Sequence, residues 1–304
     1  MSTTRRDFLK ASGGAGALLA MGDSFAQSAR VPAAPGFSLT VLATNWGFDG
    51  SWDQFAAKAA ASGYDGVEVW VPGDERDRTA FLEAMQKHKL KFGLLAGGGD
   101  RDPVKHLSQY LNGLETGLRM KPLYVNSHSG RDHFSFDQNL KFIRESIRLS
   151  GQYGIPVYHE THRGRILYSA PVSKSYLDAV PDLRLTLDIS HWCNVHESLL
   201  EDQQETVALA LSRTGHIHAR VGHAEGPQVN DPRAPEWSKA LNTHLTWWDA
   251  IINQKKKEGQ PVSVLTEFGP ADYMPALPYT RQPVADQWAI NEYMMRLMRE
   301  RYGK

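Results

Sequence analysis

The stretch GYDGVEVW, residues 63–70, contains one copy of the unit that decides the fold. Residues 66–70 form a short valine-rich run, which is typical of a buried strand. The segment before it places its apolar residues on one helical face: Trp52, Phe55, Ala56 and Ala59. Seven further strand-like runs alternate with helical patterns, at 37–43, 91–95, 123–127, 156–160, 185–189, 215–220 and 262–267. This alternation predicts parallel strands joined by crossover helices.

Eight strand-and-helix units in about 270 residues predict a single (β/α)8 TIM barrel, an α/β fold, over residues 37–304. A doubly wound open sheet is the alternative, but such a sheet usually carries a glycine-rich phosphate loop after its first strand. Residues 44–47 read Thr-Asn-Trp-Gly instead, which favours the barrel. A long proline-rich stretch, 223–237, follows the seventh predicted strand, and on a barrel we expect it at the catalytic end.

The N-terminal segment has the layout of an export signal. Residues 4–10 read Thr-Arg-Arg-Asp-Phe-Leu-Lys and precede a mild apolar run, 11–21, with small residues at 24 and 26. This layout is typical of a signal peptide, and the paired arginines resemble a twin-arginine signal. We therefore predict a signal peptide over 1–26, a spacer over 27–36, the twin-arginine export machinery as a partner, and a periplasmic or secreted location. The run is shorter than the roughly 18–20 residues that cross a bilayer, so we expect no stable membrane anchor.

The composition argues against several classes of protein. The sequence has 34 basic and 34 acidic residues, so it lacks the basic surface that favours a nucleic-acid partner. Its single cysteine, Cys193, excludes an intrachain disulfide and a thiolate-rich metal cluster. What the chain supplies in excess is histidine, because nine of its twelve histidines lie between positions 128 and 223.

Four polar residues end four consecutive predicted strands. They are, in chain order, Glu160, Asp188, His218 and Glu267. Charged groups at the end of an apolar strand are costly unless they are paired or bind an ion, and in a barrel these four ends are adjacent on one rim. Three carboxylates and one imidazole suit one divalent cation, Mn²⁺ above all, with Mg²⁺, Co²⁺ or Zn²⁺ as alternatives.

The chain resembles the xylose-isomerase-like TIM barrels, the superfamily of sugar isomerases and epimerases. The resemblance rests on Gly-Tyr-Asp-Gly-Val-Glu-Val at 63–69, His-Glu-Thr-His at 159–162 and Leu-Thr-Glu-Phe-Gly at 265–269. It implies that the same four residues are the metal ligands, and that Glu160 and Glu267 also act as acid and base. It also places a family histidine, three residues after the ligand aspartate, on His191, which we include among the catalytic candidates.

The resemblance implies a metal-dependent isomerase or epimerase that acts on a ketose, a keto sugar or a related polyol through an enediolate. The sequence departs from the epimerases at two positions: Ala224 stands where they carry an arginine, and Ile166 stands where they carry a further glutamate. A carbon–oxygen lyase on the same metal site is therefore the alternative, acting as a 3-keto-glycoside lyase or an inosose-type dehydratase.

The remaining polar and aromatic candidates near the strand ends are predicted to contact substrate: His128, His162, Arg220, Trp46 and Glu68. Strand alternation points Glu68 and His216 into the barrel and His159 outward, so Glu68 could instead support another site residue. Whether Arg163 or Arg165 binds an anionic group stays open, because solvated loop cations explain them equally well.

Two functions of other classes stay open on the sequence. A metal-free glycosidase could use Glu160 and Glu267 as its carboxylate pair, and a non-catalytic periplasmic protein could bind sugar with the same aromatics. The DNA-binding endonuclease branch of the superfamily is disfavoured by the neutral charge. Many such barrels pair through their helices, and a homo-oligomer is compatible with this sequence.

Overall fold

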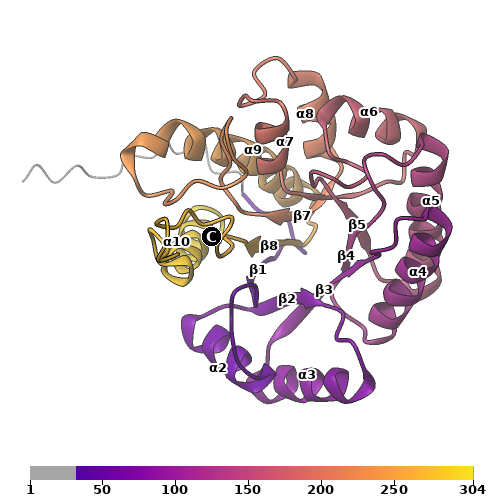
Figure 1. Ribbon diagram of the computed structural model, residues 1–304, viewed down its shortest axis with the longest axis horizontal. Helices are drawn as coiled ribbons and strands as arrows, with labels where there is room; N and C mark the ends of the chain where they lie inside the picture. The colour runs from indigo at the N-terminus through magenta and orange to yellow at the C-terminus, as the bar shows by residue number, and fades with distance from the viewer. Residues whose placement is uncertain (1–31, 304) are drawn as a thin grey trace, which may run out of the picture. The chain divides into compact units, whose positions relative to one another are not determined.

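The computed structural model describes residues 32–303 (Figure 1), so the predicted signal peptide, 1–26, and residues 27–31 of the predicted spacer lie outside the described residues. Eight parallel strands pair in sequence order, and the last pairs with the first, which closes a barrel. The strands are β1 (Leu39–Thr44), β2 (Gly66–Trp70), β3 (Lys91–Gly97), β4 (Val125–His128), β5 (Val157–Glu160), β6 (Leu185–Leu187), β7 (Thr214–His218) and β8 (Val262–Thr266). The predicted (β/α)8 barrel is confirmed.

Helices surround the strands, as Figure 1 shows for the barrel. They are α2 (Trp52–Ser62), α3 (Glu75–His88), α4 (Pro103–Arg119), α5 (Phe136–Tyr153), α6 (Ala170–Ala179), α7 (Ser190–Val195), α8 (Gln204–Ser212), α9 (Ser238–Glu258) and α10 (Gln287–Tyr302), with a short 3-10 helix, η1 (Pro235–Trp237). Two helices, α7 and α8, follow β6, and the short α7 begins directly at the strand ends. The barrel therefore brings a helical turn, as well as loops, to the carboxyl ends of its strands.

Three strands, β6, β7 and β8, end one or two residues earlier than predicted. Parallel pairing stops at the Leu187–Ile217 and His218–Leu265 partners, so β6 ends at Leu187 and β7 at His218. Asp188, Arg220 and Glu267 consequently lie just after their strands and not inside them. Their backbones are no longer held in the ladder, which leaves the side chains free to turn toward the barrel axis.

The first barrel helix shows how local sequence fixes the boundaries. Ser51 caps α2 by accepting from the N–H of Gln54, and the Gln54 side chain accepts from the N–H of Ser51 in return. Such a cap contributes about 1 kcal/mol. Gly63 ends the helix at φ +90°, in the left-handed region that favours glycine, and so directs the chain into β2.

Large aromatic side chains fill the barrel interior below the carboxyl ends of the strands. Tyr124 packs with Leu42 and Leu265, and Tyr158 packs against this cluster. A Cβ at Gly93 would lie 2.5 Å from the ring of Tyr124, so glycine is needed there for the ring to fit. The polar residues at the carboxyl ends of the strands therefore lie over a well-packed layer of side chains.

Among residues 32–303, no helix combines the length and apolar character that a membrane crossing requires.

Candidate metal centre and substrate pocket

A pocket of about 420 Å³ opens at the carboxyl ends of the strands. Its walls combine aromatic and apolar side chains with a few charged groups, as small-molecule sites usually do. The lining residues are Thr44, Asn45, Trp46, Gly47, Glu68, Val69, Trp70, Leu95, His128, Glu160, His162, Arg220, Leu265, Glu267 and Tyr273. A larger hollow, of about 660 Å³, lies on the surface at α2 and α3 and contains none of the four predicted ligands.

The four predicted metal ligands lie close together, and two of them, Glu160 and Glu267, line this pocket. Each of Glu160, Asp188, His218 and Glu267 offers a ligand atom, and these atoms lie within 4.8 Å of one another. Three of the side chains are fully or nearly fully buried, and the Glu267 side chain is 12% exposed. Four groups of this chemistry, this close and this well buried, form a candidate site for one divalent cation.

Two atoms inside this group have no hydrogen-bond partner among the described residues. They are Nδ1 of His218 and Oε2 of Glu267, which lie 2.7 Å apart without the angles of a hydrogen bond. Oε1 of Glu160 lies 3.8 Å from the same Nδ1. Buried polar atoms without partners are rare, and a cation between these ligands would satisfy both. The residues present therefore fit a bound metal ion.

The crowded charges shift the pKa values of the four groups in opposite directions. Burial, with Glu267 and Asp188 nearby, raises the pKa of Glu160 to about 8. Burial and Glu267 raise the pKa of Asp188 to about 6, although Arg220 opposes the shift. Burial alone would raise the pKa of Glu267, but His218 and Arg220 lower it to about 2. Glu267, Glu68 and Glu160, in that order, raise the pKa of His218 against the effect of burial.

Asp188 is held more tightly than the other carboxylates. Its Oδ1 accepts from the N–H and the hydroxyl of Ser190, and its Oδ2 pairs with the guanidinium of Arg220. Arg220 is 1% exposed, and its Nη2 also lies 3.6 Å from Oε2 of Glu267. A fixed positive charge thus stands beside two of the predicted ligands, and Arg220 also lines the pocket in which we predict substrate.

Three histidine rings form one wall beside the ligands. The centroid of His162 lies 4.4 Å from that of His128 and 3.9 Å from that of His191. Burial lowers the pKa of all three, that of His162 to about 3, so the rings are neutral near pH 7. Nε2 of His191 accepts from Arg220 at 2.7 Å, and Nδ1 of His162 contacts the carbonyl of Arg163 at 2.6 Å.

Aromatic side chains cover the opening. Trp46 meets Tyr273 edge to face, with centroids 4.8 Å apart. The guanidinium groups of Arg220 and Arg163 lie 4.7 and 5.1 Å from the Tyr273 ring. Arg165 does not line the pocket, and its buried Nη1 has no hydrogen-bond partner among the described residues.

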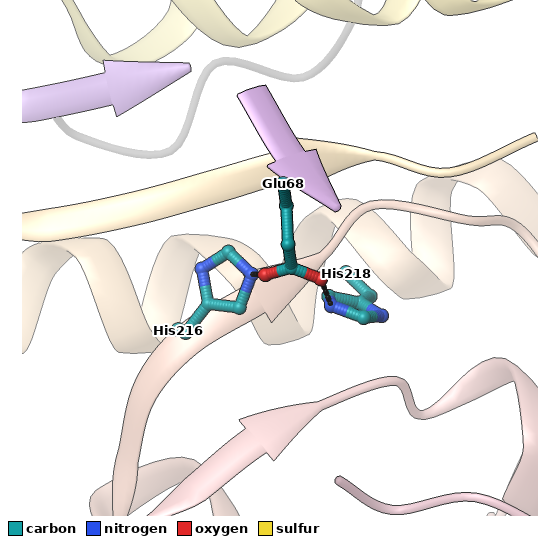
Figure 2. Close-up of side chains that lie close together, drawn as sticks. All are labelled: Glu68, His216 and His218. Carbon is teal, nitrogen blue, oxygen red and sulfur yellow. Dashed lines mark hydrogen bonds and ion pairs between the residues drawn. The ribbon is translucent and has the colours of Figure 1, made fainter. Parts of the chain in front are cut away.

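Glu68 lies deeper than the other candidates, and its side chain is fully buried (Figure 2). One oxygen lies 3.0 Å from Nε2 of His218, and the other lies 3.0 Å from Nε2 of His216. Both oxygens of Glu68 therefore already have protein partners. A direct contact between Glu68 and substrate stays a prediction. His159 points outward to Ser146 of α5, as strand alternation predicts.

Sequence reasoning missed three residues of this region. Asn126 donates to Oε2 of Glu160 at 2.8 Å, and Tyr124 contacts Glu68 from the floor. Both lie in or beside β4. Asn126 is two residues before His128, so the alternation of side chains along a strand places both on the same face, and this pattern could have identified Asn126 from the sequence. Tyr273 lies in the irregular segment between β8 and α10, where no periodic pattern marks it.

Known structures share this fold over most of the chain. The structure of a 3-keto-D-glucoside 4-epimerase from E. coli matches with a TM-score of 0.58 at 15% identity, covering 86% of this chain and 100% of that one. A xylose isomerase-like TIM-barrel protein from Mycobacterium smegmatis, in complex with magnesium, matches with a TM-score of 0.59 at 10% identity, covering 86% and 97%. A probable 3-DHS dehydratase from Bacillus anthracis matches with a TM-score of 0.55 at 16% identity, covering 86% and 98%. No curated protein matches the sequence.

Two family models match the chain itself. Residues 2–22 match the twin-arginine translocation pathway signal sequence, which marks the protein for export to the periplasm or beyond. Residues 56–247, more than half of the chain, match the model described as a xylose isomerase-like TIM barrel. The fold, the closed barrel and this match agree, and the protein belongs to the xylose isomerase-like TIM-barrel family.

Proposed function

We propose that the protein is a divalent-metal-dependent isomerase or epimerase of a ketose, a keto sugar or a related polyol. The observation that carries this proposal is the convergence of three carboxylates and one imidazole, with two unpartnered buried atoms, on one point at the pocket that Glu160 and Glu267 line. Two of the structurally similar proteins add support, since one is a 3-keto-D-glucoside 4-epimerase and another was solved with magnesium.

The metal ligands in this proposal are Glu160, Asp188, His218 and Glu267, with Mn²⁺ as the expected ion and Mg²⁺, Co²⁺ or Zn²⁺ as alternatives. When bound, a divalent cation supplies a Lewis acid that stabilises negative charge on the oxygens of an enediolate. Asn126 orients Glu160 through its 2.8 Å hydrogen bond, and Ser190 orients Asp188. These contacts hold the carboxylates before substrate arrives.

Glu160 and Glu267 are the groups we propose for proton transfer. They flank Nδ1 of His218, with Glu160 at 3.8 Å and Glu267 at 2.7 Å. One carboxylate removes the proton from the carbon next to the carbonyl, and the other returns a proton to the enediolate. His191, fixed by Arg220, orients the substrate beside them, and Trp46 and Tyr273 cover the pocket.

Carbon–oxygen bond cleavage from the same enediolate is the second candidate. The observation that favours it is the place of Ile166, where the ketose epimerases carry a second glutamate. Ile166 is 2% exposed and packs so closely on Gly130 that a Cβ there would lie 2.3 Å away. An isoleucine side chain has no titratable proton, so this position cannot take the place of that glutamate. In the elimination, one of Glu160 and Glu267 removes the carbon-bound proton and the other protonates the departing oxygen as the carbon–oxygen bond breaks.

Elemental mass spectrometry of protein purified without added metal tests the proposal. We expect about one Mn, Co or Zn ion per chain in the wild type, and loss of the ion in Glu267→Gln, because the charged ligand is removed. Glu145→Gln, which changes a carboxylate on α5, is the matched control and should keep the ion.

Two activity assays then distinguish the candidate reactions. Deuterium uptake from D₂O into free keto sugars indicates isomerisation or epimerisation, and release of the aglycone from glycosylated keto sugars indicates a lyase. An active enzyme without metal would instead assign the two glutamates to a metal-free glycosidase.

A further inference from the structure

The carboxylate of Glu68 lies within hydrogen-bond distance of three donor groups from two different parts of the barrel. Oε1 faces Nε2 of His218 at 3.0 Å, and Oε2 faces Nε2 of His216 at 3.0 Å (Figure 2). The hydroxyl of Tyr124 donates to Oε2 at 2.5 Å. All four side chains are buried, with exposures between 0% and 2%. The carboxylate thus joins β2 to β7 through the interior of the barrel.

The positions of the protons in this network follow from the acceptors. The Tyr124 hydroxyl and the two imidazoles face the two oxygens of Glu68, and a carboxylate surrounded in this way acts as the acceptor in each contact. Both Nε2 atoms that face it must therefore carry hydrogen. Nδ1 of His216 is then an acceptor, and the hydroxyl of Ser263 lies 2.7 Å away to donate to it.

The same arrangement determines what His218 presents to the pocket. With hydrogen on Nε2, a neutral His218 has its lone pair on Nδ1, the atom that faces Glu160 and Glu267. In metal sites, a carboxylate behind a ligating histidine commonly fixes the tautomer and raises the basicity of the ring. Glu68 is placed to do both.

We propose that Glu68, braced by Tyr124 and His216, is a positioning residue that fixes the tautomer and orientation of His218 for metal binding through Nδ1. This inference rests on the proposed function, because it assigns a role toward the metal of the same site. In this proposal Glu68 acts through His218 and does not contact substrate. It also distinguishes Glu68 from a ligand, although Glu68, His216 and His218 are themselves close enough to hold an ion.

The test is titration of the metal-free, full-length protein with MnCl₂, followed by the electron paramagnetic resonance signal of free Mn²⁺. Glu68→Met keeps the length of the side chain but removes both acceptors, so we expect Kd to rise by about 10- to 100-fold. Glu68→Gln is the conservative variant: its carbonyl can still accept from His218, while His216 can turn its Nδ1–H to the carbonyl of Ser263, 3.0 Å away. We expect it to restore part of the affinity, with Kd within about tenfold of the wild type but weaker than it.

Ser146→Ala is the matched control, because it removes a buried 2.7 Å hydrogen bond to His159 on the outer side of β5. It should lower Tm and leave Kd unchanged, whereas a general loss of packing would weaken Mn²⁺ binding in both variants and overturn the inference. If Glu68→Met does not fold, a Kd for Glu68→Gln equal to that of the wild type overturns it.

Three further results show whether this inference, the proposed function or both fail. Wild-type binding with unchanged affinity in the Glu68 variants leaves the proposed function intact and overturns the role of Glu68. Two Mn²⁺ ions per chain, one of them lost in Glu68→Met, would make Glu68 a ligand and overturn its positioning role. A wild type that binds no Mn²⁺, Mg²⁺, Co²⁺ or Zn²⁺ overturns both proposals.

Discussion

Nδ1 of His218 and Oε2 of Glu267 lie 2.7 Å apart, yet the contact lacks hydrogen-bond geometry. Two atoms with lone pairs repel at this distance unless positive charge lies between or beside them. In the metal-free protein a proton on His218 provides that charge, which is why its pKa is raised. A cation bound by both residues would replace the proton.

Metal affinity should therefore depend on pH. Glu160 has a pKa raised to about 8, so in the metal-free protein it holds a proton below that pH, and only its ionised form is a ligand. Binding releases protons, and Kd should fall as pH rises from about 6 to about 8, by up to about tenfold per pH unit for each proton released. MnCl₂ titrations at three pH values, with calorimetry in buffers of different ionisation enthalpy, measure the effect. Equal Kd values at both ends of the range would contradict it.

The ion pair between Arg220 and Asp188 makes a prediction about stability. Arg220→Gln leaves a buried carboxylate without its cation, so the metal-free protein should lose about 3–5 kcal/mol of unfolding free energy. Added Mn²⁺ should restore more stability to the variant than to the wild type, because the ion then supplies the positive charge that Asp188 has lost. Urea unfolding with EDTA and with MnCl₂ measures both values. Arg281→Gln, which breaks the exposed pair with Asp272, should cost less than about 1 kcal/mol, and an equal loss in both variants would count against the buried pair.

Gly269 is expected to tolerate no larger residue. A Cβ there would lie 2.3 Å from the ring of Trp46, and Gln228 ties the backbone in place through hydrogen bonds to the N–H at 2.7 Å and the carbonyl at 3.1 Å. Gly269→Ala should therefore displace Trp46, cost about 1–3 kcal/mol and raise KM for a substrate that fills the pocket. Thermal unfolding and steady-state kinetics test this.

Gly151→Ala is the control for that substitution, since nothing lies within 4 Å of a Cβ at this position in α5. It should be neutral or stabilise the protein by about 0.5–1 kcal/mol, as alanine is the better helix former. A Gly269→Ala protein as stable as this control would show that the loop and Trp46 accommodate the added methyl group without loss of stability.

Asn291 of α10 holds the backbone next to Glu267. Its carbonyl accepts from the N–H of Phe268 at 2.8 Å, and its amide donates to the Phe268 carbonyl at 2.9 Å. Asn291→Ala leaves that buried N–H unpaired, so we expect a loss of about 1–3 kcal/mol and weaker Mn²⁺ binding as Glu267 shifts. The exposed Asn242→Ala on α9 should change stability by less than about 0.5 kcal/mol. Unchanged Mn²⁺ affinity in Asn291→Ala would mean that Phe268 does not govern Glu267.

The barrel could be predicted because its signal is local and repeated. Each strand is a short apolar run such as 66–70, and each lies beside a helix whose apolar residues share a face, so eight copies identify the fold despite errors of one or two residues at the ends. The gathering of Glu160, Asp188 and Glu267 follows from the same pattern, because parallel strand ends meet on one rim.

The contacts that tune the site could not be predicted in the same way. The pairing of Glu68 with His218 depends on which side chains meet across the barrel, and the alternation of one strand does not reveal its partner on another. The Arg220–Asp188 pair depends on both strands ending before these residues. Tyr273 reaches the pocket from an irregular segment, whose path is set by hydrogen bonds from Gln228 and Asn291 and not by a periodic pattern.

The interior link between β2 and β7 has a consequence for how the molecule is assembled. Glu68 is contributed early in the chain, whereas both of its imidazole partners come from near its end. No half of the barrel contains the complete arrangement, so a nascent chain or a fragment that stops before β7 lacks both imidazole partners, and burying Glu68 there would be costly. Completion of the ring and completion of the site are therefore one event, and occupancy of the site would report that the whole barrel has closed.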